Sequence, residues 1–477
     1  MIFLWQSLLI PWLIGLLFLA LFEEAPGYRA FNCFLAAGLG LGICSSAYFL
    51  LLVVRAPWRH GIALIEYALL AALAAANLYW WRKRRRSEDK LRDSHNPPLP
   101  AAPAGKPSWM LLLSVAAVVV LAAAAFLVHL SKYPHGGWDA WAIWNLRARF
   151  LFRGGQHWRD AFTDLISWSH PDYPLLVPGL VARCWEYMGR ESLLAGQGIG
   201  AMFTLAAAGL LLTALAALRG WNQALVGSLA LVGTPLFISS GASQYADVPI
   251  CFFVLASLAL LVIEGRDPRR HWSLAALAGL AAGFAAWTKN EGLLFVLAIV
   301  VARFATFSRR EGIKSAGKRC APLLLGLTPP LLLVLYFKLS LAPPTDIFAA
   351  SGLAQRLLDP SRYGFVAASF FLQTVSFGGW FITPVLLLAI YGFCLGVKVD
   401  AVDRPAVSTV GIALALTIAG YAAIYVVTPL DLGFHIATSI DRLQLQVWPS
   451  LLLLYFLVIR APERVSMDRK KRKKKAR

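Results

Sequence analysis

The sequence predicts an all-α polytopic membrane protein. Of its 477 residues, 58% are hydrophobic and 15% are charged, whereas soluble domains carry about 25% charged residues. Apolar runs of about 20 residues, the length that crosses a bilayer as a helix, recur along the chain. Basic clusters lie between or after these runs, at 82–86, 266–270, 303–319 and 469–477. This distribution is typical of cytoplasmic loops and tails, which retain Lys and Arg.

The apolar runs predict about thirteen crossings, which place the N-terminus outside and the basic C-terminus inside. The first run lacks a basic start and a small-residue cleavage site, so we expect a retained helix rather than a signal peptide. Segment 365–378 is either a surface helix or the start of the next crossing. The expected helices are 2–22, 30–54, 61–81, 109–131, 192–218, 222–238, 246–264, 272–288, 291–306, 320–341, 379–398, 407–428 and 445–461.

The net charge of +20 is explained by membrane topology and by contact with anionic lipids, not by nucleic acid. The six cysteines are scattered and show no CxxC or Cys/His spacing, so neither a disulfide framework nor a zinc site is indicated. We therefore expect membrane lipids as partners and no nucleic acid.

Four segments follow from this pattern. Residues 1–81 form a three-helix membrane segment, 82–108 a basic and Pro-rich cytoplasmic linker, 109–461 a transmembrane module, and 462–477 a basic cytoplasmic tail. The module contains a large outer loop at 131–191. There Trp138, Trp141 and Trp144 recur every three residues, and arginines alternate with apolar residues after them. That spacing predicts an amphipathic helix in the membrane interface.

The first outer loop holds two candidate groups. Asp139, between Trp138 and Trp141, either caps the interfacial helix or acts as a general base at the membrane surface. His170, Asp172 and Tyr173 are held by two nearby prolines. They form either a structural turn or a loop that contacts substrate.

Two further groups lie at the expected outer ends of crossings. Tyr245 and Asp247 open a helix, where Asp247 is either an N-cap or a ligand for a metal or an acceptor hydroxyl. Lys289 and Glu291 interrupt a long apolar stretch, and a charge in the bilayer centre costs about 2.5–3.5 kcal/mol on insertion scales. We therefore expect a tight outer turn there, carrying either an internal ion pair or a phosphate-binding lysine.

The last outer loop, 429–444, contains His435, Asp441 and Arg442. Arg442 lies close to the start of the final helix. It either extends toward the head groups or grips a lipid phosphate, which its planar guanidinium fits.

An acid in the first large outer loop, followed by interfacial helices, resembles the GT-C superfamily of membrane glycosyltransferases. Three local patterns add to the resemblance, at 170–174 (HPDYP), 245–249 (YADVP) and 288–292 (TKNEG). Together they look like the bacterial branch related to protein mannosyltransferases and lipid A aminoarabinose transferases, similar to glycosyltransferase family 39. The resemblance covers roughly residues 109–459.

The resemblance implies an enzyme of the cytoplasmic (inner) membrane that transfers a sugar from a polyprenyl-phosphate donor on the extracytoplasmic side. The acceptor is a glycan, a lipid or a protein, as in the cell envelope. Asp139 would be the general base, Asp247 a second acid for metal or acceptor, and Lys289 and Arg442 the ligands of the donor phosphate. The remaining candidates would bind substrate: Trp138, Trp141, His170, Asp172, Tyr173, Tyr245 and Glu291.

The chain departs from the family pattern in two ways. Four expected helices precede the loop that holds Asp139, where the family usually has one, and the three before the linker suggest an N-terminal appendage. The acidic pair that many relatives carry in this loop is absent, which leaves open whether a divalent cation, Mg²⁺ or Mn²⁺, is a cofactor. A membrane transporter or lipid-linked-oligosaccharide flippase, and a non-catalytic envelope assembly protein, remain as alternatives. A transporter would place its charges in mid-membrane and show symmetric halves.

Overall fold

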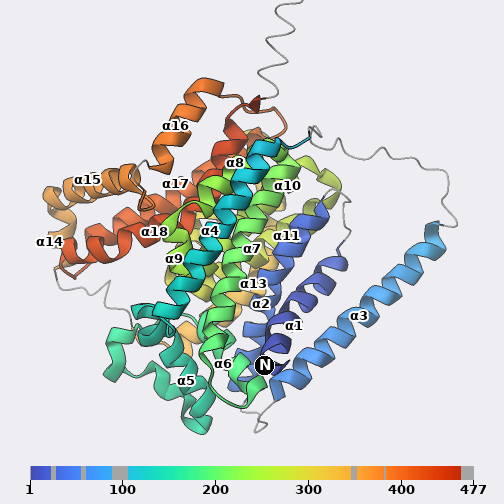
Figure 1. Cartoon of the computed structure of the whole chain (residues 1–477), viewed down its shortest axis with the longest axis vertical. Coiled ribbons are helices and arrows are strands. Elements are labelled where there is room, and N and C mark those ends of the chain that lie inside the picture. The colour runs from blue at the N-terminus through green and yellow to red at the C-terminus, as the bar shows by residue number, and fades with distance from the viewer. Residues whose placement is uncertain are drawn as a thin grey trace, which may run out of the picture.

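A computed structural model describes residues 2–22, 28–54, 61–88, 106–344, 352–380 and 383–462. Throughout these ranges the named elements are helices, and the only strand-like pairing is an isolated antiparallel bridge between Val397 and Ile459. The all-helical prediction is confirmed. Figure 1 shows a bundle of long helices with α5 (Asn145–Arg153) and α6 (Leu176–Met188) gathered at one end, beside the N-terminus. We call this the site end of the bundle.

Within the described ranges, nine helices are long and apolar enough to cross a membrane, or ten if one bent pair counts as a single span. The prediction of a multi-pass membrane protein is therefore confirmed. The number of such helices among the described residues is smaller than the thirteen crossings that the sequence predicts. The nine helices are α1 (Ile2–Ala20), α2 (Arg29–Val53), α3 (Gly61–Glu88), α4 (Trp109–Lys132), α7 (Leu193–Arg219), α10 (Asp247–Arg266), α12 (Asn290–Glu311), α13 (Ile313–Ser340) and α17 (Arg404–Val427).

Three expected crossings differ from the helices that form, and a fourth, 272–288, forms a helix with nearly the expected bounds that is not among the nine. The run 222–238 breaks into α8 (Trp221–Val232) and α9 (Pro235–Ala242), which are bent by 61° because Pro235 starts a new helix. The runs at 272–288 and 379–398 form α11 (His271–Thr288) and the shorter α16 (Pro384–Leu395). The last crossing, 445–461, is the second half of α18 (Leu432–Val458).

The segments expected around these crossings also differ in part. Segment 365–378 falls within α15 (Pro360–Ser376) except for its last two residues, and α15 follows the short α14 (Leu353–Leu358). Helix α3 continues to Glu88, into the expected linker 82–108, because its charged end still favours helix. Most of that linker and nearly all of the tail 462–477 fall outside the described residues.

Helix α10 is the core of the bundle. All its residues from Asp247 to Glu264 are buried, and it packs against α7, α11 and α18. A helix that is apolar on all sides has no polar face for water, so it takes the centre. Helix α4 contrasts with it, since none of its residues is buried and it contacts only one side of the bundle, at α8 and α9.

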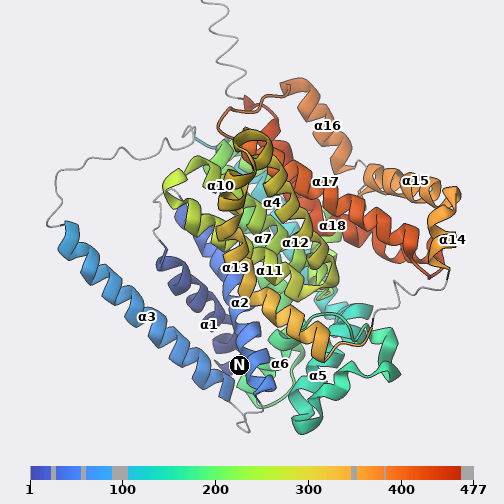
Figure 2. The same ribbon diagram turned by 180° about the vertical axis from the view of Figure 1, so that it is seen from behind.

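Helices α1 and α2 are part of the same bundle, whereas α3 stands apart from it along most of its length (Figures 1 and 2). A Cβ added at Gly40 would lie 1.7 Å from the carbonyl oxygen of Pro11, so only glycine lets α1 and α2 approach this closely. Helix α2 also packs against α6 and α7. Helices α1 and α2 therefore rest directly on the module that follows the linker.

The expected outer loop 131–191 folds into short helices that cover the site end. A π-helix, η2 (Ala140–Trp144), leads into α5, and two 3-10 segments, η3 (Gly155–Phe162) and η4 (Asp164–Ser169), lead to α6. The Trp138 and Trp141 side chains are 57% and 42% exposed, whereas Trp144 is buried. Of the three tryptophans expected to face the head groups, Trp138 and Trp141 are thus at the surface, whereas Trp144 lies in the core.

Candidate functional site

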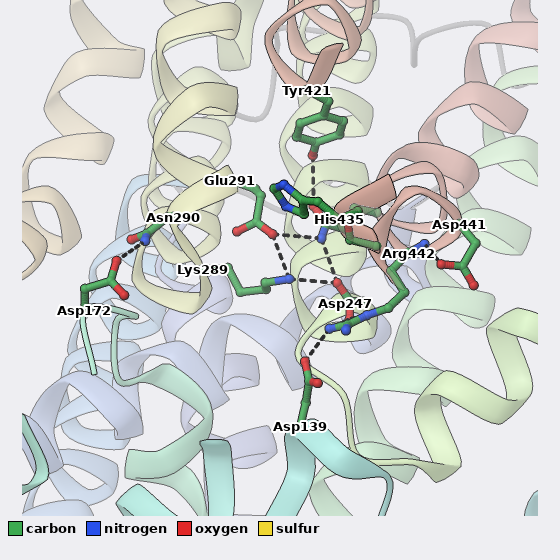
Figure 3. Close-up of polar contacts among 12 residues, drawn as sticks. Asp139, Asp172, Asp247, Lys289, Asn290, Glu291, Tyr421, His435, Asp441 and Arg442 are labelled. Atoms are coloured by element: carbon green, nitrogen blue, oxygen red, sulfur yellow. Dashed lines mark hydrogen bonds and ion pairs between the residues drawn. The ribbon is translucent and has the colours of Figure 1, made fainter. Parts of the chain in front are cut away.

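Asp247 is the centre of a buried ionic cluster (Figure 3). It lies in the first turn of α10 and is fully buried. Its Oδ1 accepts hydrogen bonds from Lys289 Nζ at 3.0 Å and Gln446 Nε2 at 2.7 Å. Its Oδ2 accepts from Arg442 Nε at 3.0 Å. Since the side chain binds these three groups and caps no helix, the capping interpretation of Asp247 does not describe this structure.

Lys289 is the single residue between α11 and α12, in extended backbone conformation. The expected tight turn is therefore present. Its ammonium group lies 3.0 Å from Asp247 and 2.7 Å from Glu291. Burial disfavours the charged amine, but these two carboxylates outweigh burial and hold the pKa of Lys289 above its usual value. The ion pair between Lys289 and Glu291 is thus present, and it forms part of a larger cluster.

Asp139 precedes the π-helix η2, and its side chain makes no capping hydrogen bond there. Instead its Oδ2 accepts from Arg442 Nη2, so that Arg442 lies between Asp139 and Asp247 (Figure 3). The guanidinium also lies over the Tyr245 ring, 4.7 Å from its centroid. The Asp139 and Arg442 side chains keep 12% and 19% of their surface exposed.

A second polar group adjoins the first. Asp172 accepts from Asn290 Nδ2 at 2.6 Å, and its carboxylate lies 3.5 Å from Lys338 Nζ. Asn290 belongs to the same turn as Lys289, and the Lys289 amine lies 5.7 Å from the centroid of the Tyr173 ring. The α11–α12 junction therefore connects the two groups.

Tyr173 stacks between two rings. Its interplanar angle is 12° with Trp144 and 14° with His170. The fully buried Arg147 donates to the Tyr173 carbonyl oxygen at 2.6 Å, and burial lowers the pKa of Arg147 to about 10. The 170–174 loop is thus fixed by stacking and by a buried guanidinium.

The structure brings most of the sequence-derived candidates together. Asp139, Asp247, Lys289, Glu291 and Arg442 share one network, with Tyr245 beneath it. The candidates of the 170–174 loop lie beside it, as described above. Two do not join the network: Trp138 and Trp141 contact each other edge to face at 4.6 Å and remain exposed.

Sequence reasoning missed Gln446 and Tyr421. Gln446 is fully buried and donates to Asp247 and Glu291, while Tyr421 donates to Gln446 Oε1 at 2.9 Å. The available signal was a glutamine inside an apolar run, four residues after Arg442, because residues at that spacing share one helix face. Tyr421 carried no signal. Asn290, Arg147 and Lys338 were also missed.

Two buried oxygen atoms at the α11–α12 junction have no partner among the described residues: Asn290 Oδ1 and Glu291 Oε2. Asn290 must direct its amide nitrogen toward the Asp172 carboxylate, which leaves its oxygen on the other side. Because buried acceptors are normally satisfied, the junction has hydrogen-bonding capacity that the protein itself does not fill.

A cleft of about 510 Å³ opens beside η2. It begins where α4 ends and reaches Trp141, two residues after Asp139. Its lining is basic and aromatic, and comprises Lys132, Tyr133, Pro134, His135, Gly136, Trp141 and Arg149.

The residues at Asp247 do not fit a resident metal ion. Within the described ranges, no group of three Asp, Glu, His or Cys side chains is placed to hold one. Both oxygens of Asp247 already accept from cationic side chains, and a divalent cation there would repel Lys289 and Arg442.

Comparisons with protein-family models, with curated proteins and with solved structures give no match to this chain.

Proposed function

We propose that this protein is a membrane glycosyltransferase that moves a sugar from a polyprenyl-phosphate donor to an acceptor hydroxyl on the extracytoplasmic face of the cytoplasmic membrane. One observation carries the proposal. At a single end of an apolar bundle, two cations and three carboxylates from four separate segments meet in one buried network. Ionic groups in an apolar interior are costly, so their concentration at one place supports a functional site.

The chemistry assigns a role to each part of the network. The acceptor oxygen attacks the anomeric carbon of the donor while the bond from that carbon to the phosphate oxygen breaks. The acceptor proton passes to Asp139, and the phosphate leaves with the electron pair, held by Lys289 and Arg442. General-base assistance of this kind contributes about 10²–10⁴-fold, and fixed cations at a departing phosphate contribute further.

The aromatic cleft that Trp141 lines supplies room for a second substrate. Trp141 lies on its wall and Asp139 two residues earlier in the same segment. Aromatic faces suit the apolar faces of sugars and the boundary of a membrane. The acceptor is therefore a glycan, a lipid head group or a protein side chain that reaches this surface.

The test is transfer from a radiolabelled polyprenyl-phosphate sugar in proteoliposomes that contain the full chain and a cell-envelope extract as the acceptor source. We expect labelled product with the native chain and none above background with Asp139→Asn. The control is Asp160→Asn, which changes an exposed acid elsewhere in the same loop and should transfer normally. Normal transfer by Asp139→Asn would remove the general base from the proposal.

Transport is the second candidate, and a specific observation favours it. Helices α8 and α9 form a broken span bent by 61°, and interrupted helices build the ion and substrate sites of many transporters. Against it, the network containing Asp247 lies at one end of α10 rather than at its middle. Uptake of a labelled solute into proteoliposomes, without any covalent product, would favour the transporter.

A further inference from the structure

Arg442 connects two carboxylates that are held very differently. Asp247 is fully buried and also accepts from Lys289 and Gln446. Among the described residues, Asp139 has one hydrogen-bond partner, Arg442 itself, and its side chain is 12% exposed. Withdrawing Arg442 from Asp247 would leave a deeply buried charge with less compensation, whereas Asp139 could exchange its partner for water. The Asp139 contact is therefore the weaker of the two.

The charge of the network also limits how a phosphate can bind. Asp139, Asp247 and Glu291 supply three carboxylates, while Lys289 and Arg442 supply two cations. An arginine side chain does not lose its proton in proteins, so its charge is constant. An anion that enters next to these residues adds to an existing excess of negative charge. It is accommodated only if it replaces a carboxylate on one of the cations.

The surroundings keep Arg442 in place during such an exchange. Its guanidinium lies over the Tyr245 ring and contacts Asp247 through both Nε and Nη2. Tyr245 is itself confined, because a Cβ at Gly137 would lie 2.4 Å from its hydroxyl oxygen. Arg442 can therefore exchange Asp139 for another anion without leaving its position.

We propose that Arg442 is an exchangeable clamp. In the ligand-free protein it holds Asp139, and the phosphate group of a lipid phosphate takes the place of Asp139 on the guanidinium. Asp139 is thereby released from the guanidinium, free to accept a proton. This inference rests on the proposed function and adds a coupling to it, because the base becomes free only when the phosphate has bound. When Asp139 returns to Arg442, it displaces the phosphate.

The test measures binding of farnesyl phosphate to the purified full chain in detergent, without any transfer reaction. Asp139→Asn removes the competing charge, so we expect farnesyl phosphate to bind at least about fivefold more tightly, since a hydrogen bond between charged groups changes affinity by about tenfold or more. Arg442→Gln should weaken binding by about tenfold. The double variant should bind like Arg442→Gln alone, because Asp139 acts only through Arg442.

Two controls accompany this measurement. Farnesol, which lacks the phosphate, should bind equally to the native chain and to Asp139→Asn. Asp403→Asn breaks another arginine–carboxylate pair, with Arg266 at the far end of α10, and should leave farnesyl phosphate binding unchanged. If Asp139→Asn does not fold, as judged by thermal unfolding, Asp139→Ser serves the same purpose.

The outcomes are distinguishable. Unchanged or weaker binding of farnesyl phosphate to Asp139→Asn would overturn the clamp while leaving the proposed transferase intact. Absence of phosphate-dependent binding to the native chain would overturn both. Tighter binding by Asp139→Asn, lost again in the double variant, supports the clamp even where no sugar transfer is detected.

Discussion

The guanidinium group of Arg183 in α6 binds both carboxylate oxygens of Glu66 in α3, and both side chains are fully buried. Tyr187 adds a hydrogen bond to the same carboxylate at 2.7 Å, and the Ser7 carbonyl oxygen accepts from Arg183. Helices α1, α3 and α6 thus meet at one ion pair. Helices α1 and α3 are thereby tied to α6 at the site end of the bundle.

Breaking this ion pair from one side should destabilise the protein. Glu66→Gln leaves the buried Arg183 charge without its counter-ion, a change that costs about 3–5 kcal/mol in comparable cases. The double variant Glu66→Leu with Arg183→Met removes both charges and should recover most of the loss. The measurement is thermal unfolding of the full chain in detergent. Equal stability of Glu66→Gln and the native chain would show that α3 does not hold α6.

Lys289 has a structural role as well as the proposed catalytic one, and the two can be separated. Lys289→Met should lower both thermal stability and transfer, because Asp247 and Glu291 lose their shared cation. Adding Asp247→Asn should restore stability but not transfer. The readouts are the unfolding temperature and the initial rate of product formation. Recovery of transfer in the double variant would argue that Lys289 only neutralises Asp247.

Tyr421 should act as a positioning residue through Gln446. Tyr421→Phe removes the hydrogen bond that orients the Gln446 amide, and this amide donates to Asp247 and Glu291. We expect kcat to fall by about tenfold with KM nearly unchanged, as when one positioned donor is lost. The control is Tyr363→Phe, whose exposed hydroxyl donates to the Leu357 carbonyl oxygen. A fall in stability without a change in kcat would contradict this role.

Acid should inhibit transfer through His435. This histidine lies in the N-terminal part of α18, before the expected crossing. Burial lowers its pKa, as does the nearby His170, while Glu291 opposes them. The folded chain therefore takes up this proton at lower pH than the unfolded chain. Above about pH 6.5 His435 is neutral in both the folded and the unfolded chain, so it does not lower the free energy of unfolding. Below that pH the unfolded chain takes up the proton first, and the free energy of unfolding falls until the pH reaches the lowered pKa of the folded chain.

The measurement for His435 is the transfer rate and the unfolding temperature from pH 8 to pH 5. His435→Gln should flatten the acid limb of both profiles. His157→Gln changes a histidine that is 83% exposed and should leave both profiles unchanged. An identical acid limb in His435→Gln would assign the titration to another group.

Chelation should not abolish transfer, because the two cations at Asp247 are side chains rather than metal ions. We expect the rate after treatment with EDTA to remain within about twofold of the untreated rate, a difference of less than about 0.5 kcal/mol in the barrier. Added Mg²⁺ or Mn²⁺ should give no recovery. A chelated protein that regains activity only with one of these ions would show that the network rearranges around a metal.

Much of the fold could be predicted from the sequence, because the hydrophobic period and the length of an apolar run are local properties. The runs at 30–54 and 109–131 agree with α2 and α4 to within a few residues. The run at 222–238 does not, because Pro235 divides it and tertiary packing bends the two halves. The run at 445–461 was too short, since its apolar content begins only after the polar first half of α18.

The sequence by itself determined the class of protein and the residue types at each helix junction: an acid before η2, an acid at the start of α10, a lysine between α11 and α12, and a glutamate in the first turn of α12. It did not determine which charges pair. Asp139 and Arg442 are 303 residues apart in the sequence. Their contact depends on how α18 packs against α10 and on where the chain places Asp139 before η2. A side chain becomes a cap, an ion-pair partner or a base according to the groups that surround it, and only the tertiary structure brought those groups together.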